Sequence, residues 1–118
     1  MSYRCMNPGQ FSGQVVANGS CVRFVQVAAR VPHTSTWKEG KKVRGGNIPT
    51  GTAIATFVAG RYPNRPSGNH AAILISENAD GLLVWDQWKG RPVGKRLIRF
   101  RGDDPDLSNN GDAFSVIE

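Results

Sequence analysis

The chain has 118 residues, of which 39% are hydrophobic and 20% charged, and these values predict one globular domain over residues 1–118 and exclude a disordered chain. No apolar run reaches the roughly 18 residues of a membrane-spanning helix, and the N-terminus lacks the apolar stretch of a signal peptide, so we expect neither membrane insertion nor export by that route. With 15 Lys and Arg against 9 Asp and Glu, the formal net charge of +6 predicts attraction to a polyanion such as nucleic acid, an anionic membrane surface or an acidic wall polymer.

The first predicted helix follows an irregular lead-in over residues 1–17, which shows no sustained hydrophobic period. Residues 18–20 offer N-cap side chains, and from Cys21 onward apolar residues recur at the spacing of one helical face. We therefore predict a helix from about Cys21 to Arg30. Pro32 ends it, because the residue before a proline is disfavoured in the helical conformation.

A basic loop and then a set of short strands are predicted for the rest of the chain. Residues 33–50 are polar and rich in lysine and glycine, and they predict an exposed loop that Trp37 anchors to the body. Residues 78–81 (Asn-Ala-Asp-Gly) are typical of a hairpin turn. One helix followed by antiparallel strands is the α+β pattern, here with four to five strands. We expect these strands at 52–58, 71–76, 82–88, 96–101 and 113–117.

Cysteine and histidine each occur only twice, as Cys5 and Cys21 and as His33 and His70. Neither a C-x-x-C nor an H-x-x-x-H spacing occurs, so we expect no metal site and no cofactor. Two cysteines are too few for a disulfide scaffold, although a single bridge between them is an open alternative. That bridge would remove the free thiol that a cysteine hydrolase needs.

Cys21 and His70 are the candidate nucleophile and general base. At the start of a helix, Cys21 faces free backbone N–H groups and the positive end of the helix dipole, which favour the thiolate. A cysteine hydrolase also needs a histidine that takes and returns a proton, and His70 begins a predicted strand among small residues. His33 is the other possible base, but it follows a proline in a connector that gives it no rigid mount.

Asp86 and Gln87 are the candidates for the group that orients His70. The predicted hairpin places the end of the strand over 82–88 beside the start of the strand that follows His70. Successive strand residues face opposite sides of a sheet, so only one of the two side chains can serve. We favour Asp86 because its charge can stabilise a protonated imidazole.

Each of these residues also has a structural interpretation that needs no catalysis. A lone cysteine on the apolar face of a helix is more often core than nucleophile. His70 on its own could be a strand-end surface residue. The three residue types in one chain order, with hairpin geometry joining two of them, favour the catalytic interpretation.

Three segments carry a resemblance to a known family: residues 18–26 (NGSCVRFVQ), 68–73 (GNHAAI) and 84–88 (VWDQW). The chain resembles the papain-like bacterial cell-wall amidases of the CHAP and NlpC type, which are cysteine, histidine-dependent amidohydrolases/peptidases, and in particular their small stand-alone domains. The similarity extends over about residues 13–118. It implies a papain-like fold in which the helix that begins at Cys21 packs on the antiparallel sheet.

The resemblance also implies an activity, which is hydrolysis of amide bonds in peptidoglycan peptides through a triad of Cys21, His70 and Asp86. The oxyanion is then held by the backbone N–H of Cys21 and one further donor, for which Asn18 and Ser20 are candidates. Some relatives carry glutamine at the position of Ser20. Similar domains act as type VI secretion effectors or as phage lysis enzymes, so we expect synthesis in a bacterial cytoplasm, a non-classical route to a periplasm or cell wall, and for an effector an immunity protein as partner.

Two other functions remain open on sequence grounds. Basic residues near Trp85 and Trp88 could form a nucleic-acid-binding or wall-polymer-binding surface, although no recognised nucleotide-binding motif is present, which disfavours nucleic acid. A papain-like domain could also bind without catalysis, with Cys21 buried and inert. The reactivity of the Cys21 thiol separates these alternatives from the enzyme.

Overall fold

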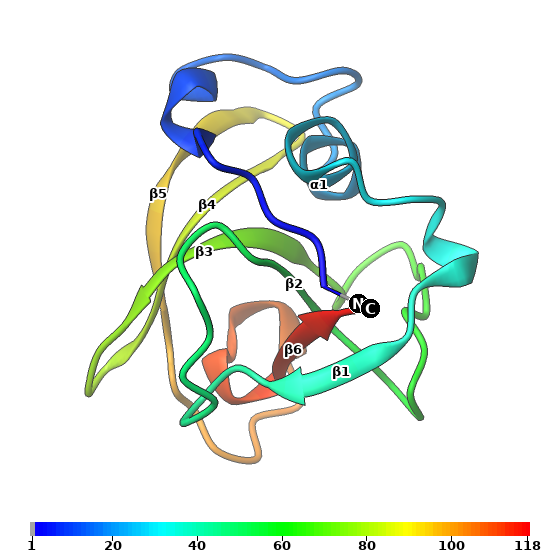
Figure 1. The fold of residues 1–118 in the computed structure, drawn as a ribbon. Helices are drawn as coiled ribbons and strands as arrows, with labels where there is room; N and C mark the ends of the chain where they lie inside the picture. Colours follow the sequence, from blue (N-terminus) through cyan, green and yellow to red (C-terminus); the bar gives the residue numbers. More distant parts are fainter. Residues whose placement is uncertain (1) are drawn as a thin grey trace.

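The computed structural model describes residues 2–118, in which one α-helix lies against an antiparallel sheet of six strands (Figure 1). The strand order is β1-β6-β2-β3-β4-β5, and every neighbouring pair is antiparallel. This confirms the predicted α+β class and the single helix that begins at Cys21. The elements are α1 (Cys21–Ala29), β1 (Glu39–Lys42), β2 (Ala53–Thr56), β3 (Ala71–Glu77), β4 (Gly81–Trp88), β5 (Arg91–Arg99) and β6 (Phe114–Ile117), with short 3-10 turns at Pro8–Phe11, Thr34–Thr36, Leu107–Asn109 and Gly111–Ala113.

The prediction of four to five strands was wrong, because the predicted basic loop over residues 33–50 contains β1. This strand pairs with β6 at one edge of the sheet, and most of its side chains are exposed. Charged edge strands carry no apolar alternation, so the pattern that reveals a half-buried strand is missing here. Trp37 just before it is buried against Tyr62, with ring centroids 4.9 Å apart, as expected of an anchor.

Helix α1 starts and stops at residues whose local chemistry explains both ends. The Ser20 side chain caps the helix by accepting a hydrogen bond of 3.2 Å from the backbone N–H of Arg23. At the other end Arg30 adopts a left-handed conformation with φ of +58°, so the helix ends one residue earlier than predicted. Phe24 and Val25 are fully buried and fix the helix to the sheet.

Within the described residues 2–17, the lead-in has one 3-10 turn and then runs along the outer strand β5. The N–H of Gly13 donates to the carbonyl of Val93 at 2.8 Å, and the N–H of Val93 donates to Gln14 at 2.9 Å. The second edge of the sheet is therefore partly covered by the lead-in. Strand β5 also begins five residues before the predicted position, since its first residues include a proline and a glycine that mask it.

Side chains at alternate positions of the central strands supply two apolar clusters, one on each face of the sheet. On the helix side the strand residues are small, which lets α1 pack closely against β3 and β4. The far side holds larger side chains. The helix-side cluster includes Phe24, Val25, Ala53, Ala71 and Ile73, and the other includes Ile54, Ala72, Leu74, Val84 and Phe114.

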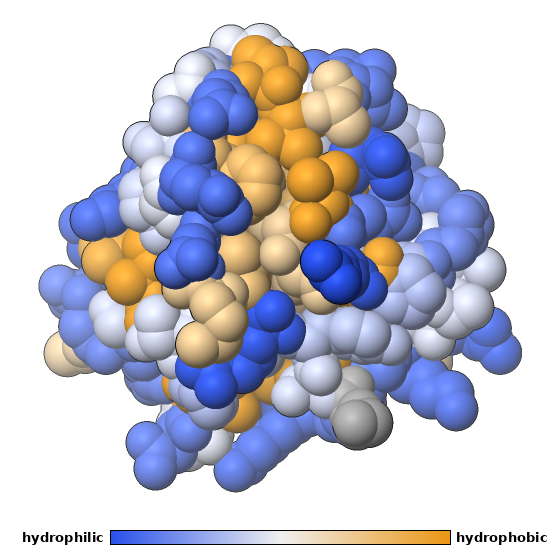
Figure 2. Space-filling model, turned by 45° about the horizontal axis from the view of Figure 1, so that its top comes forward, coloured by the Kyte–Doolittle hydropathy of each residue, from blue (hydrophilic) through white to orange (hydrophobic). Residues whose placement is uncertain are grey.

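Apolar side chains also reach the surface. In Figure 2, which brings the top of Figure 1 forward, they form a band between polar side chains. Within residues 2–118 no helix has the length and apolar character to cross a membrane. The large hydrophobic side chains with the greatest exposure are Met6, Val15, Val27, Val58 and Trp88.

Candidate active site

Cys21 is the first residue of α1, so its side chain lies where the helix leaves backbone N–H groups free. The positive end of the helix dipole at this point favours a negative charge on the sulfur. Both cysteines are free, which excludes the bridge between Cys5 and Cys21. Cys5 is buried, whereas Cys21 is partly accessible and lines a pocket. Cys21 is therefore the thiol that a substrate can reach.

His70 stands directly before β3 and is only 5% exposed. Its backbone N–H donates to the Thr56 hydroxyl at 3.0 Å, and its carbonyl accepts from the Thr56 N–H at 3.0 Å. Strand β2 thus holds the histidine on a rigid mount. His70 also lies close enough to Cys21 for the two side chains to shift each other's pKa, so the two candidate groups are neighbours although 49 positions separate them in sequence.

Asp86 contacts the other side of the imidazole. Its Oδ2 lies 2.7 Å from Nε2 of His70, and the carboxylate is fully buried. Strand pairing explains the contact. Ile73 of β3 lies opposite Trp85 of β4, and the same register, continued, places His70 opposite Trp88. Asp86 is two positions from Trp88 along β4 and is therefore a diagonal neighbour of His70. Since Nε2 faces Asp86, Nδ1 is the nitrogen left to face the thiol.

The protonation states of the three groups depend on one another. Burial by itself lowers the pKa of His70, but hydrogen bonds to Asp86 and Cys21 and their negative charges outweigh it and raise this pKa to about 9. Burial by itself raises the pKa of the Cys21 thiol, yet the hydrogen bond and positive charge of His70 bring that pKa below its ordinary value. The arrangement therefore favours a thiolate and imidazolium pair near neutral pH.

Two arginines of β5 bind the same carboxylate, a feature that the sequence analysis missed. Arg91 donates to Oδ1 of Asp86 at 2.7 Å, and Nε of Arg96 donates to Oδ2 at 2.9 Å. Burial by itself raises the pKa of Asp86, but its bonds to His70 and Arg96 outweigh that effect and lower the pKa. A hairpin of β4 and β5 would have indicated this contact from the sequence. In that hairpin Arg96 lies opposite Val84, which makes it a diagonal cross-strand neighbour of Asp86.

Tyr62 is a second residue that the sequence analysis missed. Its hydroxyl lines the same pocket as Cys21, close enough for the charge of Cys21 to affect it, and accepts a hydrogen bond of 3.0 Å from Nδ2 of Asn69. Burial and the charge of Cys21 raise the pKa of Tyr62, so the hydroxyl keeps its proton and can donate it to the sulfur. Tyr62 lies in a proline- and glycine-rich loop, where no periodic pattern marks a side chain that points inward.

Gln87 lies on the opposite face of β4 from Asp86 and does not contact His70. Its Oε1 accepts from the N–H of Val16 at 2.9 Å, and its Nε2 donates to the carbonyls of Val16 and Ser20 at 2.8 and 2.9 Å. Of the two alternatives for orienting His70, Asp86 is thus the one in contact. Gln87 instead fixes the segment that leads into Cys21.

Asn18 and Ser20 line the same pocket as Cys21, and their side-chain oxygens accept backbone hydrogen bonds. Oδ1 of Asn18 accepts from the N–H of Ser20 at 3.0 Å, and the Ser20 hydroxyl oxygen is occupied as the helix cap. His33 also lines this pocket, but its Nδ1 is bonded to Ser35 at 2.9 Å. These contacts order the loops on both sides of Cys21.

Two pockets flank the meeting point of Cys21 and His70, and Asn69 lines both. One has a volume of about 460 Å³ and includes Cys21 and Tyr62. The other has a volume of about 310 Å³ and includes His70 and Trp88. A peptide chain that crosses Asn69 can therefore present a bond to the thiol and fill a pocket on either side of it.

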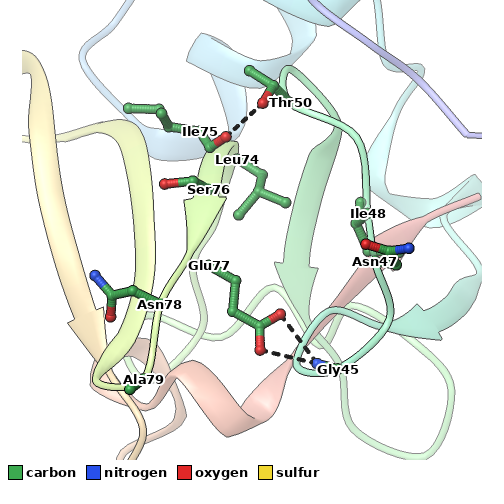
Figure 3. Close-up of a pocket in the computed structure, with 10 residues that line it drawn as sticks. All are labelled: Gly45, Asn47, Ile48, Thr50, Leu74, Ile75, Ser76, Glu77, Asn78 and Ala79. Carbon is green, nitrogen blue, oxygen red and sulfur yellow. Dashed lines mark hydrogen bonds between the residues drawn. The ribbon is translucent and has the colours of Figure 1, made fainter.

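A larger pocket of about 720 Å³ lies at the opposite end of β3 (Figure 3). The Glu77 carboxylate there accepts from the N–H of Gly45 at 3.1 Å, and the Thr50 hydroxyl donates to the carbonyl of Ile75 at 2.7 Å. Neither a cysteine nor a histidine lines it. This pocket therefore lacks the thiol and imidazole that lie together beside the smaller pockets.

Known proteins are similar to this chain in sequence and in fold. A type VI secretion amidase effector 2 protein of Salmonella typhi is 45% identical over 111 residues, covering 83% of this chain and 84% of the relative. A protein named domesticated amidase effector 2 from Ixodes scapularis is 38% identical over 122 residues, covering 97% and 83%. The solved structure of a type 6 secretion amidase effector 2 superposes with a TM-score of 0.89 at 40% identity, covering 98% of this chain and 94% of that one. The family described as domesticated amidase effector 2 matches residues 1–117, and the chain belongs to this family.

Proposed function

We propose that this amidase hydrolyses amide bonds in the peptides of peptidoglycan, with Cys21 as nucleophile, His70 as general acid and base, and Asp86 as the group that orients His70. The observation that carries the proposal is the buried 2.7 Å contact between His70 and Asp86, with the Cys21 thiol near enough to His70 for the imidazole to lower the pKa of the thiol. Membership of an amidase effector family supports it.

In the first half of the reaction the Cys21 thiolate attacks the amide carbonyl and forms a tetrahedral intermediate. The backbone N–H of Cys21 donates to the oxyanion, and Asn18, Ser20 and the Tyr62 hydroxyl are candidates for the second donor. Protonated His70 then gives its proton to the departing nitrogen, the C–N bond breaks, and an amine and a thioester result.

In the second half neutral His70 takes a proton from water as that water attacks the thioester. The C–S bond breaks, the carboxylic acid product leaves, and the thiolate and imidazolium pair is restored. Asp86 stays ionised throughout, since two arginines and the imidazole donate to it, and its charge stabilises each imidazolium state.

We also propose a biological setting and an architecture for this activity. The protein acts as an antibacterial effector that is made in a bacterial cytoplasm, reaches a target periplasm by type VI secretion, and is blocked in the producer by an immunity protein. Residues 1–118 act as one domain with a papain-like core of the CHAP and NlpC type. The packing of the helix that bears Cys21 against β3 and β4 of an antiparallel sheet supports this architecture.

A nucleic-acid-binding function depends on tryptophan rings that are open to stacked bases. Lys95 lies over the ring of Trp85 at 5.4 Å, and Arg91 and Arg96 lie over the ring of Trp88 at 4.6 and 5.1 Å. The protein's own cations thus occupy positions that a base would need. The positive charge is better matched to an anionic wall polymer.

Digestion of purified sacculi tests the proposed function. We expect the wild-type protein to release new amide-cleavage products, identified by mass spectrometry, and Cys21→Ala to release none. Cys5→Ala is the matched control and should release the same products as the wild type. Release by Cys21→Ala would overturn the assignment of the nucleophile, and no release by any folded variant would overturn the activity on peptidoglycan.

A further inference from the structure

The pocket that contains Cys21 and Tyr62 is lined by two arginines, Arg23 and Arg65, and by no aspartate or glutamate. Apart from the Cys21 thiolate, its fixed charges are therefore positive. The two guanidinium groups give a wall that attracts anions.

The arginines around the active site differ in whether their charge is already satisfied. Arg96, on the other pocket, is bound to Asp86 at 2.8 Å and to Asn109 at 3.1 Å. Arg23 donates to Oε1 of Gln26 at 2.6 Å. The guanidinium of Arg65 has no hydrogen bond or ion pair with any residue in the described range 2–118, so its donors remain available to a ligand.

The backbone of Arg65 is nonetheless held in place. Oδ1 of Asn69 accepts from the N–H of Arg65 at 2.9 Å, and Nδ2 of the same side chain donates to the Tyr62 hydroxyl at 3.0 Å. One amide therefore ties Arg65 to the tyrosine that contacts Cys21. The backbone of Arg65 is thereby held beside the pocket, and its exposed guanidinium can reach a ligand that binds there.

We propose that this pocket is a subsite for a free carboxylate of the substrate peptide and that Arg65 binds this carboxylate. The inference rests on the proposed function, since it names the chemical group that the same active site recognises beside the scissile amide. A guanidinium binds a carboxylate through two parallel N–H···O bonds, which neither a carboxamide nor an ester reproduces. Arg65 thus determines specificity and takes no part in bond cleavage.

The test uses a cross-linked peptide dimer from peptidoglycan and a series of dimers in which each free carboxylate in turn is replaced by a carboxamide. We expect one replacement to lower kcat/KM of the wild-type protein by about 10- to 100-fold. Arg65→Gln should cleave that carboxamide dimer as well as the wild type does. It should cleave the parent dimer no faster than the carboxamide dimer, so its ratio of kcat/KM for the two dimers falls to about 1. Arg65→Lys keeps the positive charge but cannot form two parallel hydrogen bonds to a carboxylate, so its ratio of kcat/KM should lie between those of the wild type and Arg65→Gln.

Arg61→Gln is the matched control, because it removes the same charge from the same loop at a residue that does not line the pocket. It should keep the wild-type preference for the free acid. Equal cleavage of all dimers by the wild type, or an unchanged preference in Arg65→Gln, would overturn the subsite while leaving the amidase activity in place. Failure of the wild type to cleave any dimer or sacculus would instead overturn the proposed function.

Discussion

At the residue scale the central feature is a buried imidazole between two negative groups. His70 keeps its proton up to about pH 9, whereas Cys21 loses its proton more easily than a free thiol. At a pH above the lowered pKa of the Cys21 thiol and below the raised pKa of His70, the sulfur is ionised before substrate arrives. His70 then already carries the proton that the leaving amine needs.

The pH dependence of kcat/KM should therefore have an alkaline limb near pH 9, because this ratio reports the protonation of the free enzyme. As the pH rises through this value His70 loses the proton that the departing nitrogen needs, so the rate falls. In Asp86→Asn the loss of negative charge lowers the pKa of His70, moves the alkaline limb to lower pH and reduces kcat by about 100-fold or more. Rate profiles on a soluble peptide, with circular dichroism as a check on folding, measure both effects.

Asp80→Asn is the control for this change, since Asp80 lies in the exposed turn between β3 and β4. Its profile should coincide with that of the wild type. An alkaline limb in Asp86→Asn at the wild-type position would contradict the role given to the carboxylate.

At the element scale the site depends on β4, whose consecutive residues Asp86 and Gln87 serve opposite faces. Asp86 holds the imidazole from one face. Gln87 on the other face spans the loop before α1 through Val16 and Ser20 and so sets where the helix begins. One strand thus positions both partners of the reaction.

Gln87→Ala should lower the free energy of unfolding by about 2–4 kcal/mol, because the buried N–H of Val16 loses its partner and the carbonyls of Val16 and Ser20 each lose one of two hydrogen bonds. We expect slower alkylation of Cys21 by iodoacetamide as well, since the start of α1 is no longer fixed. Urea denaturation measures the first effect and a timed alkylation measures the second. Gln10→Ala, in the exposed 3-10 turn, should change neither quantity. A loss below 1 kcal/mol would show that the loop does not depend on Gln87.

The sequence was most informative where periodicity and chemistry coincided. The apolar stripe from Cys21 and the hairpin turn before β4 follow from spacing, which also brings either Asp86 or Gln87 beside His70, and charge favours Asp86 of the two. Strand β1 was missed because a charged edge strand shows no alternation, and the start of β5 because it contains a proline and a glycine. Tyr62 and Asn69 escaped because their contacts depend on how a loop of irregular backbone folds over the helix terminus.

At the scale of the whole molecule the charge is the dominant property. A formal net charge of +6 draws the protein to an anionic polymer over distances at which single contacts do not act. Salt screens such attraction, with a Debye length of about 10 Å at 0.1 M ionic strength.

Binding of the inactive Cys21→Ala variant to sacculi should therefore weaken as sodium chloride is raised. Sedimentation of the protein with sacculi at increasing salt measures this, and binding that is independent of salt would contradict an electrostatic contribution. As the control, cleavage of a short uncharged peptide by the wild type should change little over the same range, because no long-range attraction assists it.

The two arginines on Asp86 give the site redundancy. Arg91 holds one oxygen of the carboxylate and Arg96 the other, so the loss of either cation leaves the group ionised and still fixed. We therefore expect the loss of one arginine to leave the charge and orientation of Asp86 in place, and only the loss of both to release the carboxylate from β5.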